Sequence, residues 1–175
     1  HEDGLIYLHE NLNKYIPEFD NMTVSTAYID KKGQNQERVV EAKNKIKIYN
    51  LLNHTSGLTY GTFGNSYAKK RLKSSEISKL NLEDISLKKY VKELAKFPLA
   101  YNPNTVWEYG RSIEVLGRVI EIASNKTLDI FLKDKIFKPL DMIDTAFYVN
   151  ESKWHRIAEP FKDKQPKLIN IRDKP

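Results

Sequence analysis

The chain has 175 residues, of which 40% are hydrophobic and 30% charged, and it carries a formal net charge of +6 and no cysteine. Its length is sufficient for one domain with a buried core or for part of a larger one, and the lack of Cys excludes disulfides, Cys-ligated zinc and a thiol nucleophile. No apolar run approaches the roughly 18 residues that a membrane-spanning helix needs, and the four His residues show no metal-ligand spacing, so we predict no metal site and no cofactor.

The first predicted elements are an apolar-spaced segment over residues 5–19 and a β-hairpin. The β-branched stretches "MTVSTAYID" and "ERVVEA" flank the turn-prone "KKGQNQ", which predicts a hairpin at about 22–41. A short helix is expected at about 46–54 and has to end before Gly57. The polar, glycine-containing residues 59–76 are expected to form a loop.

Three further helices are predicted. Ser86 is a typical N-cap for a helix at about 86–96, which carries an apolar stripe at i, i+3, i+4 and i+7. Residues 112–124 are apolar almost all round, which indicates a helix buried between neighbours. An amphipathic helix at about 127–137 is stopped by Pro139. We therefore predict one α-rich segment over residues 1–175 with a small β-hairpin, and no doubly wound sheet.

The positive charge raises nucleic acid as a partner. Lys is scattered along the whole chain, however, and the densest cluster is only "KKRLK" at 69–73. No zinc-finger or RNA-recognition signature accompanies it. We therefore read the charge as a solvated surface and predict no nucleic-acid partner; salt-sensitive retardation of DNA or RNA would contradict this.

Nucleophile candidates are few. The G-x-S-x-G elbow of α/β-hydrolases is absent. "HTSG" brings His54 and Ser56 close in sequence, but Thr and Ser beside a Gly at a helix end more often bond backbone groups or open the next turn. Ser-x-x-Lys occurs at Ser66 and at Ser86, as chance predicts for a chain so rich in Lys. Neither pair is predicted to be catalytic.

Tyr109, in "WEYGRS", is the strongest candidate for proton transfer. Ser112 resembles the N-cap of the helix that follows, so the positive end of that helix would favour a phenolate. Arg111 adds a nearby cation if it turns inward. Both effects would lower the tyrosine pKa from about 10 toward that of a general base. The commoner role of such a residue is that of a packed aromatic with an exposed hydroxyl, and residue chemistry alone leaves both open.

Five stretches together resemble one family, the class C β-lactamase-like serine hydrolases, and most closely its carboxylesterase branch. They occur in the family's order and at its approximate spacings from residue 5 to about 160: "LNKYIPEF", "IKIYNLLNHTSGLTYG", "FPLAYNPNTVWEYGRSIEVLGRVIEIAS", "FLKDKIFKPLDMIDTAFYV" and "RIAEPF". The resemblance implies the helical domain of the α/β β-lactamase/transpeptidase-like fold, with most of the antiparallel sheet missing from this chain.

The resemblance also implies a site. Members of this family activate a Ser through the Lys of a Ser-x-x-Lys box, a Tyr shares the proton transfer, and backbone N–H groups form the oxyanion hole. Only Tyr109 carries over, as general base or proton relay. Tyr60 and Phe63, in the loop after "HTSGL", and Arg111 and Ser112, beside Tyr109, are the expected substrate contacts.

The other two boxes are expected outside this sequence, the Ser-x-x-Lys box before residue 1 and the third box beyond residue 175. The chain therefore resembles a central fragment that is inactive alone. Its parent is expected to cleave a small-molecule ester or β-lactam-like amide through an acyl-enzyme, in the cytoplasm or after export. The alternative is a non-catalytic relative used for binding or assembly. Surface that faces the missing sheet is expected to be apolar and to favour self-association.

Three departures from the family share one theme. Asn104, Asn125 and Asp141 stand where relatives usually show Gly. Asn and Asp are the residues other than Gly that best tolerate left-handed backbone. The turns are therefore expected to keep their geometry.

Overall fold

The computed structural model describes residues 1–61, 66–75, 77 and 85–158. The chain divides into two compact units, unit 1 over His1–Leu128 and unit 2 over Asp129–Pro175. None of the helices in the described ranges combines the length and the apolar character needed to cross a bilayer. Phe63, one of the expected substrate contacts, lies outside the described residues.

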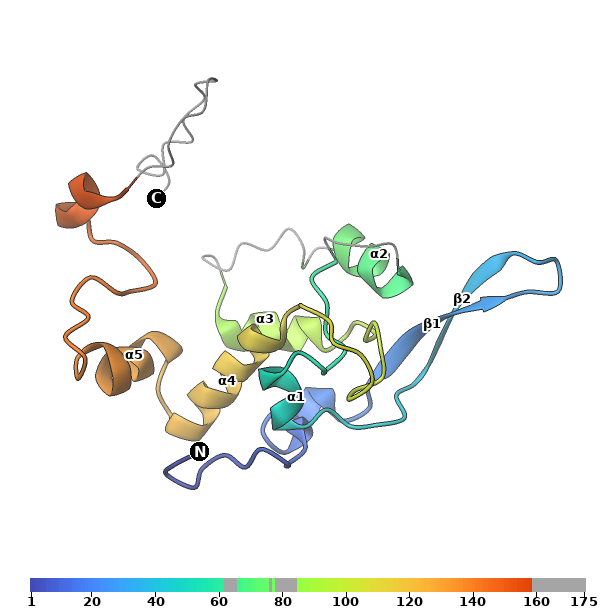
Figure 1. Ribbon diagram of the computed structural model, residues 1–175, viewed down its shortest axis with the longest axis horizontal. Helices are drawn as coiled ribbons and strands as arrows, with labels where there is room; N and C mark the ends of the chain where they lie inside the picture. The colour runs from blue at the N-terminus through green and yellow to red at the C-terminus, as the bar shows by residue number, and fades with distance from the viewer. Residues whose placement is uncertain (62–65, 76, 78–84, 159–175) are drawn as a thin grey trace, which may run out of the picture. The chain divides into compact units, whose positions relative to one another are not determined.

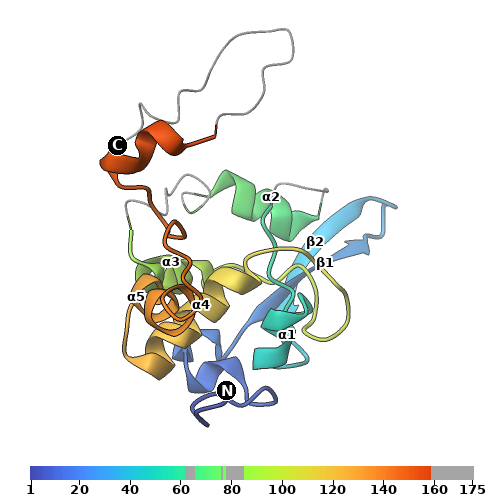
Figure 2. The ribbon, with the colours of Figure 1, turned by 60° about the vertical axis from the view of Figure 1, so that its left-hand side comes forward.

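Unit 1 contains the predicted hairpin. Strands β1 (Thr23–Ile29) and β2 (Asn35–Glu41) pair antiparallel. The turn between them is closed by Asp30, whose carboxylate accepts two backbone N–H groups of the turn at 2.8 and 2.9 Å, and by Gly33 at a φ of 76°. Figures 1 and 2 show the hairpin extending away from the helices of this unit.

Short helices make up most of the rest. In unit 1 they are η1 (Leu12–Lys14), η2 (Pro17–Phe19), α1 (Ile48–Leu52), α2 (Tyr67–Ser74), α3 (Leu87–Leu94) and α4 (Ser112–Ser124). Then come α5 (Leu128–Leu132), the π-helical turn η4 (Lys133–Phe137) and η5 (Glu151–Arg156). Helix α4 packs against both α1 and α3. An α-rich segment with a small hairpin is thus confirmed.

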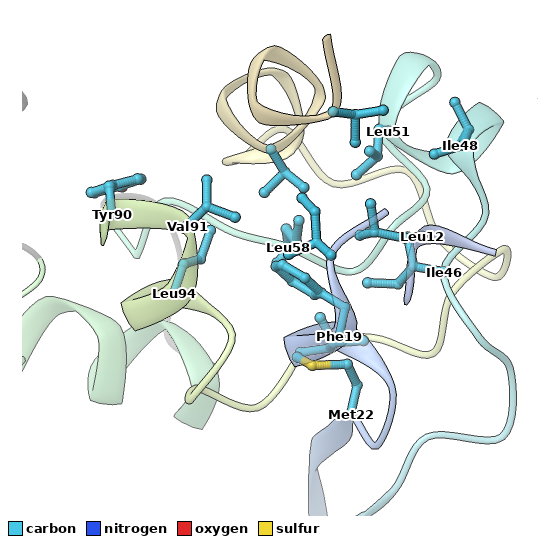
Figure 3. Packing of buried hydrophobic residues seen from close by; sticks show 14 of the residues in the cluster. Leu12, Phe19, Met22, Ile46, Ile48, Leu51, Leu58, Tyr90, Val91 and Leu94 are labelled. Atoms are coloured by element: carbon cyan, nitrogen blue, oxygen red, sulfur yellow. The ribbon is translucent and has the colours of Figure 1, made fainter. Parts of the chain in front are cut away.

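The core of unit 1 draws side chains from most elements of this unit (Figure 3). They come from η1, η2, β1, α1, α2, α3, α4 and the segment after α1, and include Leu12, Phe19, Val24, Leu51, Leu58, Leu72, Val91 and Val115. Each such burial stabilises the fold by about 1.5–3 kcal/mol. Because Leu58 belongs to the core, the loop that follows α1 is anchored to the same structure that holds α4.

Helix α2 corrects the loop predicted over residues 59–76. Ser66 begins the helix by accepting a backbone N–H of its first turn at 3.4 Å. Ala68 and Leu72, four residues apart, are buried on one face. The polar composition hid this helix because Lys and Arg are good helix formers and two apolar residues are enough to hold one short face.

Helix α1 is shorter than its predicted extent. It ends at Leu52, with Asn53 as C-cap, and His54 follows at a φ of 56°. A left-handed residue cannot continue a right-handed helix. The turn therefore comes before Gly57, and residues from 54 onward are available to build a loop.

The left-handed turns confirm the expectation from the three departures. Asn104, Asn125 and Asp141 have φ of 67°, 53° and 53°. Asn125 is the C-cap of α4, a position that Gly usually occupies in this conformation.

We expect Asn125→Ala to lower the free energy of unfolding of the protein by about 1–2 kcal/mol, because Ala has neither Gly's freedom nor Asn's local hydrogen bonds in this conformation. Asn125→Gly should leave it within about 0.5 kcal/mol. Thermal unfolding of the two variants beside the natural chain measures the difference. Equal melting temperatures for Ala and Gly would contradict the role of the left-handed turn.

Unit 2 has an apolar surface of its own. Several of its large side chains are exposed, among them Leu140, Ile143, Phe147 and Tyr148. They adjoin or line a cavity of about 640 Å³ that also carries Lys133, Lys138 and Lys153 on its walls.

Candidate active site

Tyr109 lies in the loop that leads into α4, where two loops of unit 1 meet. The loop after α1 (54–61) and the loop before α4 (100–110) are joined by backbone hydrogen bonds. Their N···O distances are 2.8 Å in all three cases: Ala100 to Gly57, Asn104 to Thr55, and Glu108 to His54, donor first. The three bonds hold the loops side by side along their length.

Two glycines let these backbones approach closely. A Cβ at Gly57 would lie 2.1 Å from the carbonyl oxygen of Tyr101, and one at Gly110 would lie 2.2 Å from the carbonyl oxygen of Leu58. Gly57 also has a φ of 83°. No larger residue fits at either position without moving backbone. Tyr109 is thus preceded and followed by residues whose main chain is fixed.

The ring of Tyr109 lies in a cluster of aromatic side chains. Its centroid is 5.0 Å from that of His54 and 5.4 Å from that of Tyr60. Trp107 stacks at 6.4 Å with an interplanar angle of 23°. Tyr109 is 55% exposed and Trp107 65%. The cluster thus places the predicted proton relay at the surface, with aromatic side chains beside it.

Arg111 does turn inward, and its partners are other than Tyr109. The guanidinium lies 4.4 Å over the Tyr60 ring and 5.5 Å over the Tyr90 ring. Its Nη1 is 3.3 Å from Oε1 of Glu114, the same oxygen that accepts the Tyr60 hydroxyl at 3.1 Å. These cation–π and ionic contacts hold Tyr60 in place.

The hydroxyl of Tyr60 is a poor proton acceptor in this setting. Burial, followed by the negative charge of Glu114, raises the pKa of Tyr60 to about 12. The phenol therefore stays protonated at neutral pH and donates to Glu114. The hydroxyl of Tyr109, in contrast, has no hydrogen bond to any of the described residues.

Ser112 differs from its prediction in two ways. The N-cap of α4 is Arg111, and Ser112 is the first residue of the helix. Its side chain is fully buried, and its Oγ lies 2.8 Å from Oγ of Ser56, which is also fully buried. Ser112 therefore supports the loops from inside and does not line the surface as a substrate contact. The reason is that the helix packs on its first turn, which draws the small hydroxyl inward.

The "HTSG" stretch is structural, as predicted. Ser56 bonds Ser112, and its Oγ accepts the backbone N–H of Leu58 at 3.2 Å, which opens the next turn. Thr55 accepts from the amide of buried Asn50 at 2.8 Å. The imidazole of His54 meets the aromatic rings, and its Nδ1 is buried without a hydrogen-bond partner in the described structure.

In each of the two Ser-x-x-Lys pairs, the serine is the N-cap of a helix. Ser66 caps α2, and Ser86, as predicted, caps α3 by accepting a backbone N–H at 3.3 Å. The amine of Lys69 instead lies 2.9 Å from Oε1 of Glu108. Sequence reasoning missed Lys69, Glu108 and the Trp107 ring as parts of this site. The described residues also hold no cluster of His, Asp and Glu placed to bind a metal ion.

Comparisons with known proteins agree on one family. The sequence profile described as Beta-lactamase matches residues 1–173. Esterase EstB of Burkholderia gladioli is 34% identical over 129 residues, which cover 73% of this chain and 32% of that protein. The lovastatin esterase of Penicillium rubens is 32% identical over 147 residues, covering 84% of this chain and 35% of that protein.

A solved structure agrees as well. Unliganded simvastatin synthase (LovD) of Aspergillus terreus, as the selenomethionyl derivative, superposes with a TM-score of 0.70 at 27% identity, over 90% of this chain and 37% of its own. The chain thus spans about a third of the length of each of these relatives.

Proposed function

Because this chain belongs to the Beta-lactamase family, we propose that the protein containing it is a serine hydrolase that cleaves esters or β-lactam-like amides through an acyl-enzyme. The observation that carries the proposal is the position of Tyr109. Its half-exposed ring stands at the start of α4 between His54 and Tyr60, on a loop whose backbone is fixed on either side. The esterase names of two relatives support an ester substrate.

The chemistry assigned to Tyr109 is proton transfer. As the serine oxygen bonds to the substrate carbonyl carbon, its proton has to leave; as the bond to the leaving group breaks, the departing oxygen or nitrogen has to gain one. A side chain that reaches both atoms can accept the first proton and deliver the second. Tyr109 offers a hydroxyl on an exposed ring, whereas the hydroxyl of Tyr60 is held by Glu114.

Substrate contact is assigned to the aromatic walls. Tyr60 lines the site beside Tyr109, and Arg111 supports it from behind through the cation–π contact. Arg111 is only 19% exposed at its side chain, so its part is to hold Tyr60 and Glu114 more than to bind substrate directly. An aromatic wall fits the acyl or alkoxy group of an ester better than a charged group.

The nucleophile is proposed to come from outside this chain. The serines of both Ser-x-x-Lys pairs in residues 1–175 are helix N-caps, and Lys69 of the first pair forms an ion pair with Glu108. The chain also covers only about a third of its relatives. We therefore expect the segment alone to be inactive and the serine and lysine to belong to the full-length protein.

Covalent labelling tests this proposal. The full-length protein should react with a fluorophosphonate probe and hydrolyse a short-chain p-nitrophenyl ester, whereas a polypeptide of residues 1–175 should do neither. Peptide mapping should place the label on a serine outside residues 1–175. Label on a serine inside them would refute the assignment of the nucleophile. A full-length protein that neither reacts nor turns over ester would favour the non-catalytic alternative.

A further inference from the structure

The ion pair between Lys69 and Glu108 is the part of the site that the proposed function does not use. Nζ and Oε1 are 2.9 Å apart, and the two side chains are only 12% and 13% exposed. The same carboxylate oxygen accepts the hydroxyl of Thr59 at 2.8 Å. Charge-assisted hydrogen bonds of this length are among the stronger polar contacts in proteins. A nearly buried ion pair thus stands one residue before Tyr109.

Tyr109 depends on its neighbours for its orientation. More than half of the residue is exposed, so packing around the ring does not fix it as it would fix a core residue. The preceding residue, Glu108, is held through its backbone N–H by His54 and through its carboxylate by Lys69. Glu108 is therefore tied to the structure at both its main chain and its side chain, and Tyr109 follows directly.

Helix α2, which supplies Lys69, has contacts of its own with the hairpin. Arg71 Nε lies 3.0 Å from Glu37 Oε1 on β2, and the Tyr67 hydroxyl donates to the carbonyl of Asn35 at 3.1 Å. Because both contacts reach the hairpin, α2 is held by more than its ion pair with the loop before α4. Lys69 is thus a cation on a separate helix, and its ion pair with Glu108 holds the loop before α4 against that helix.

We infer that Lys69 and Glu108 form a clamp that positions Tyr109 for proton transfer. This inference rests on the proposed function of Tyr109. Both are positioning residues, since neither touches the reacting atoms. The Ser66-x-x-Lys69 spacing has a structural role: Ser66 is the N-cap of α2, and Lys69, about one turn later, reaches Glu108 in the loop before α4. Removing one partner leaves the other charge buried and uncompensated, so the loop has to shift to let water reach it.

The test is made in the full-length protein with a p-nitrophenyl ester. Glu108→Gln and Lys69→Met should each lower kcat by about tenfold to a hundredfold, since small displacements of a catalytic group have effects of this size. KM should stay within about twofold, because the substrate contacts remain. Burst titration of active sites corrects each kcat for misfolded enzyme.

Three further variants serve as comparisons. Lys69→Arg keeps the cation opposite Glu108 and should recover most of the lost kcat. Lys70→Met removes the same charge from the next residue of α2, which is exposed, and should leave kcat unchanged. The double variant Lys69→Met with Glu108→Gln should lose no more kcat than either single variant, because the two residues act as one unit.

The outcomes separate the two proposals. If Lys69→Met retains as much turnover as Lys70→Met while Tyr109→Phe loses it, the clamp is refuted and the proposed function stands. If Tyr109→Phe keeps normal turnover, the proposed role of Tyr109 in proton transfer fails, and the clamp that rests on it fails with it. A kcat loss that Lys69→Arg does not recover, or a rise in KM alone, also refutes the clamp. Should Glu108→Gln not fold, Thr59→Val removes one donor to the same carboxylate, and a lower kcat with unchanged KM is then expected.

Discussion

Tyr109→Phe in the full-length protein is expected to lower kcat for a p-nitrophenyl ester by about 10²–10⁴-fold, the range typical for loss of a positioned acid–base group. The change deletes one oxygen atom. The ring keeps its contacts with His54 and Tyr60, so folding and KM should be close to those of the natural protein. Steady-state kinetics, together with a thermal melt of each variant, measures both.

Two other tyrosines provide controls for this prediction. Tyr28→Phe, on the hairpin, deletes the same atom from another exposed ring and should not affect turnover. Tyr60→Phe deletes a hydroxyl that stays protonated and bonded to Glu114, so its effect should be far smaller than that of Tyr109→Phe. Turnover of Tyr109→Phe that matches Tyr28→Phe would remove Tyr109 from the mechanism.

Gly110→Ala is expected to destabilise the full-length protein by about 3 kcal/mol or more, at the upper end of the effects of overpacking. The added Cβ would lie 2.2 Å from the carbonyl oxygen of Leu58 and 2.6 Å from Cα of Thr59. Both are backbone atoms of a loop anchored in the core, so neither can move cheaply. Activity should fall as well, even well below the melting temperature, because relief of the clash has to shift the residue next to Tyr109.

Gly33→Ala is the matched control. A Cβ at Gly33 meets nothing within 4 Å, although its φ of 76° is left-handed. Its cost is therefore only the backbone strain of about 1–2 kcal/mol, and its kcat should be unchanged. If Gly110→Ala and Gly33→Ala have the same melting temperature and the same kcat, the loops after α1 and before α4 are not packed as tightly as the structure indicates.

The parts of the fold that follow a regular pattern were predictable. β-Branched residues on either side of a turn predict the hairpin, and the apolar residues of 112–124 predict α4. The resemblance to class C β-lactamase-like hydrolases, confirmed by the family match, located Tyr109. It also led to the expectation that Asn104, Asn125 and Asp141 adopt left-handed backbone, which the structure shows.

Contacts between distant segments were not predictable in the same way. The partnership of Lys69 with Glu108 requires α2, and the polar residues around it read as a loop. The N-cap of α4 was assigned to Ser112 because Ser is the commoner cap, yet this hydroxyl is buried against Ser56. The sequence left open whether Arg111 turns inward, and its partners, Tyr60, Tyr90 and Glu114, depend on how three segments meet.

The join between the loops after α1 and before α4 consists of main-chain atoms. Three N–H···O=C bonds and two glycines make it, and such contacts do not depend on which side chains stand between them. Trp107, which projects from this join into solvent, is therefore open to substitution at little structural cost. A scaffold of this kind separates the residue proposed to move the proton from the side chains proposed to contact substrate, so side-chain substitutions can change the substrate contacts while the backbone that holds Tyr109 keeps its geometry.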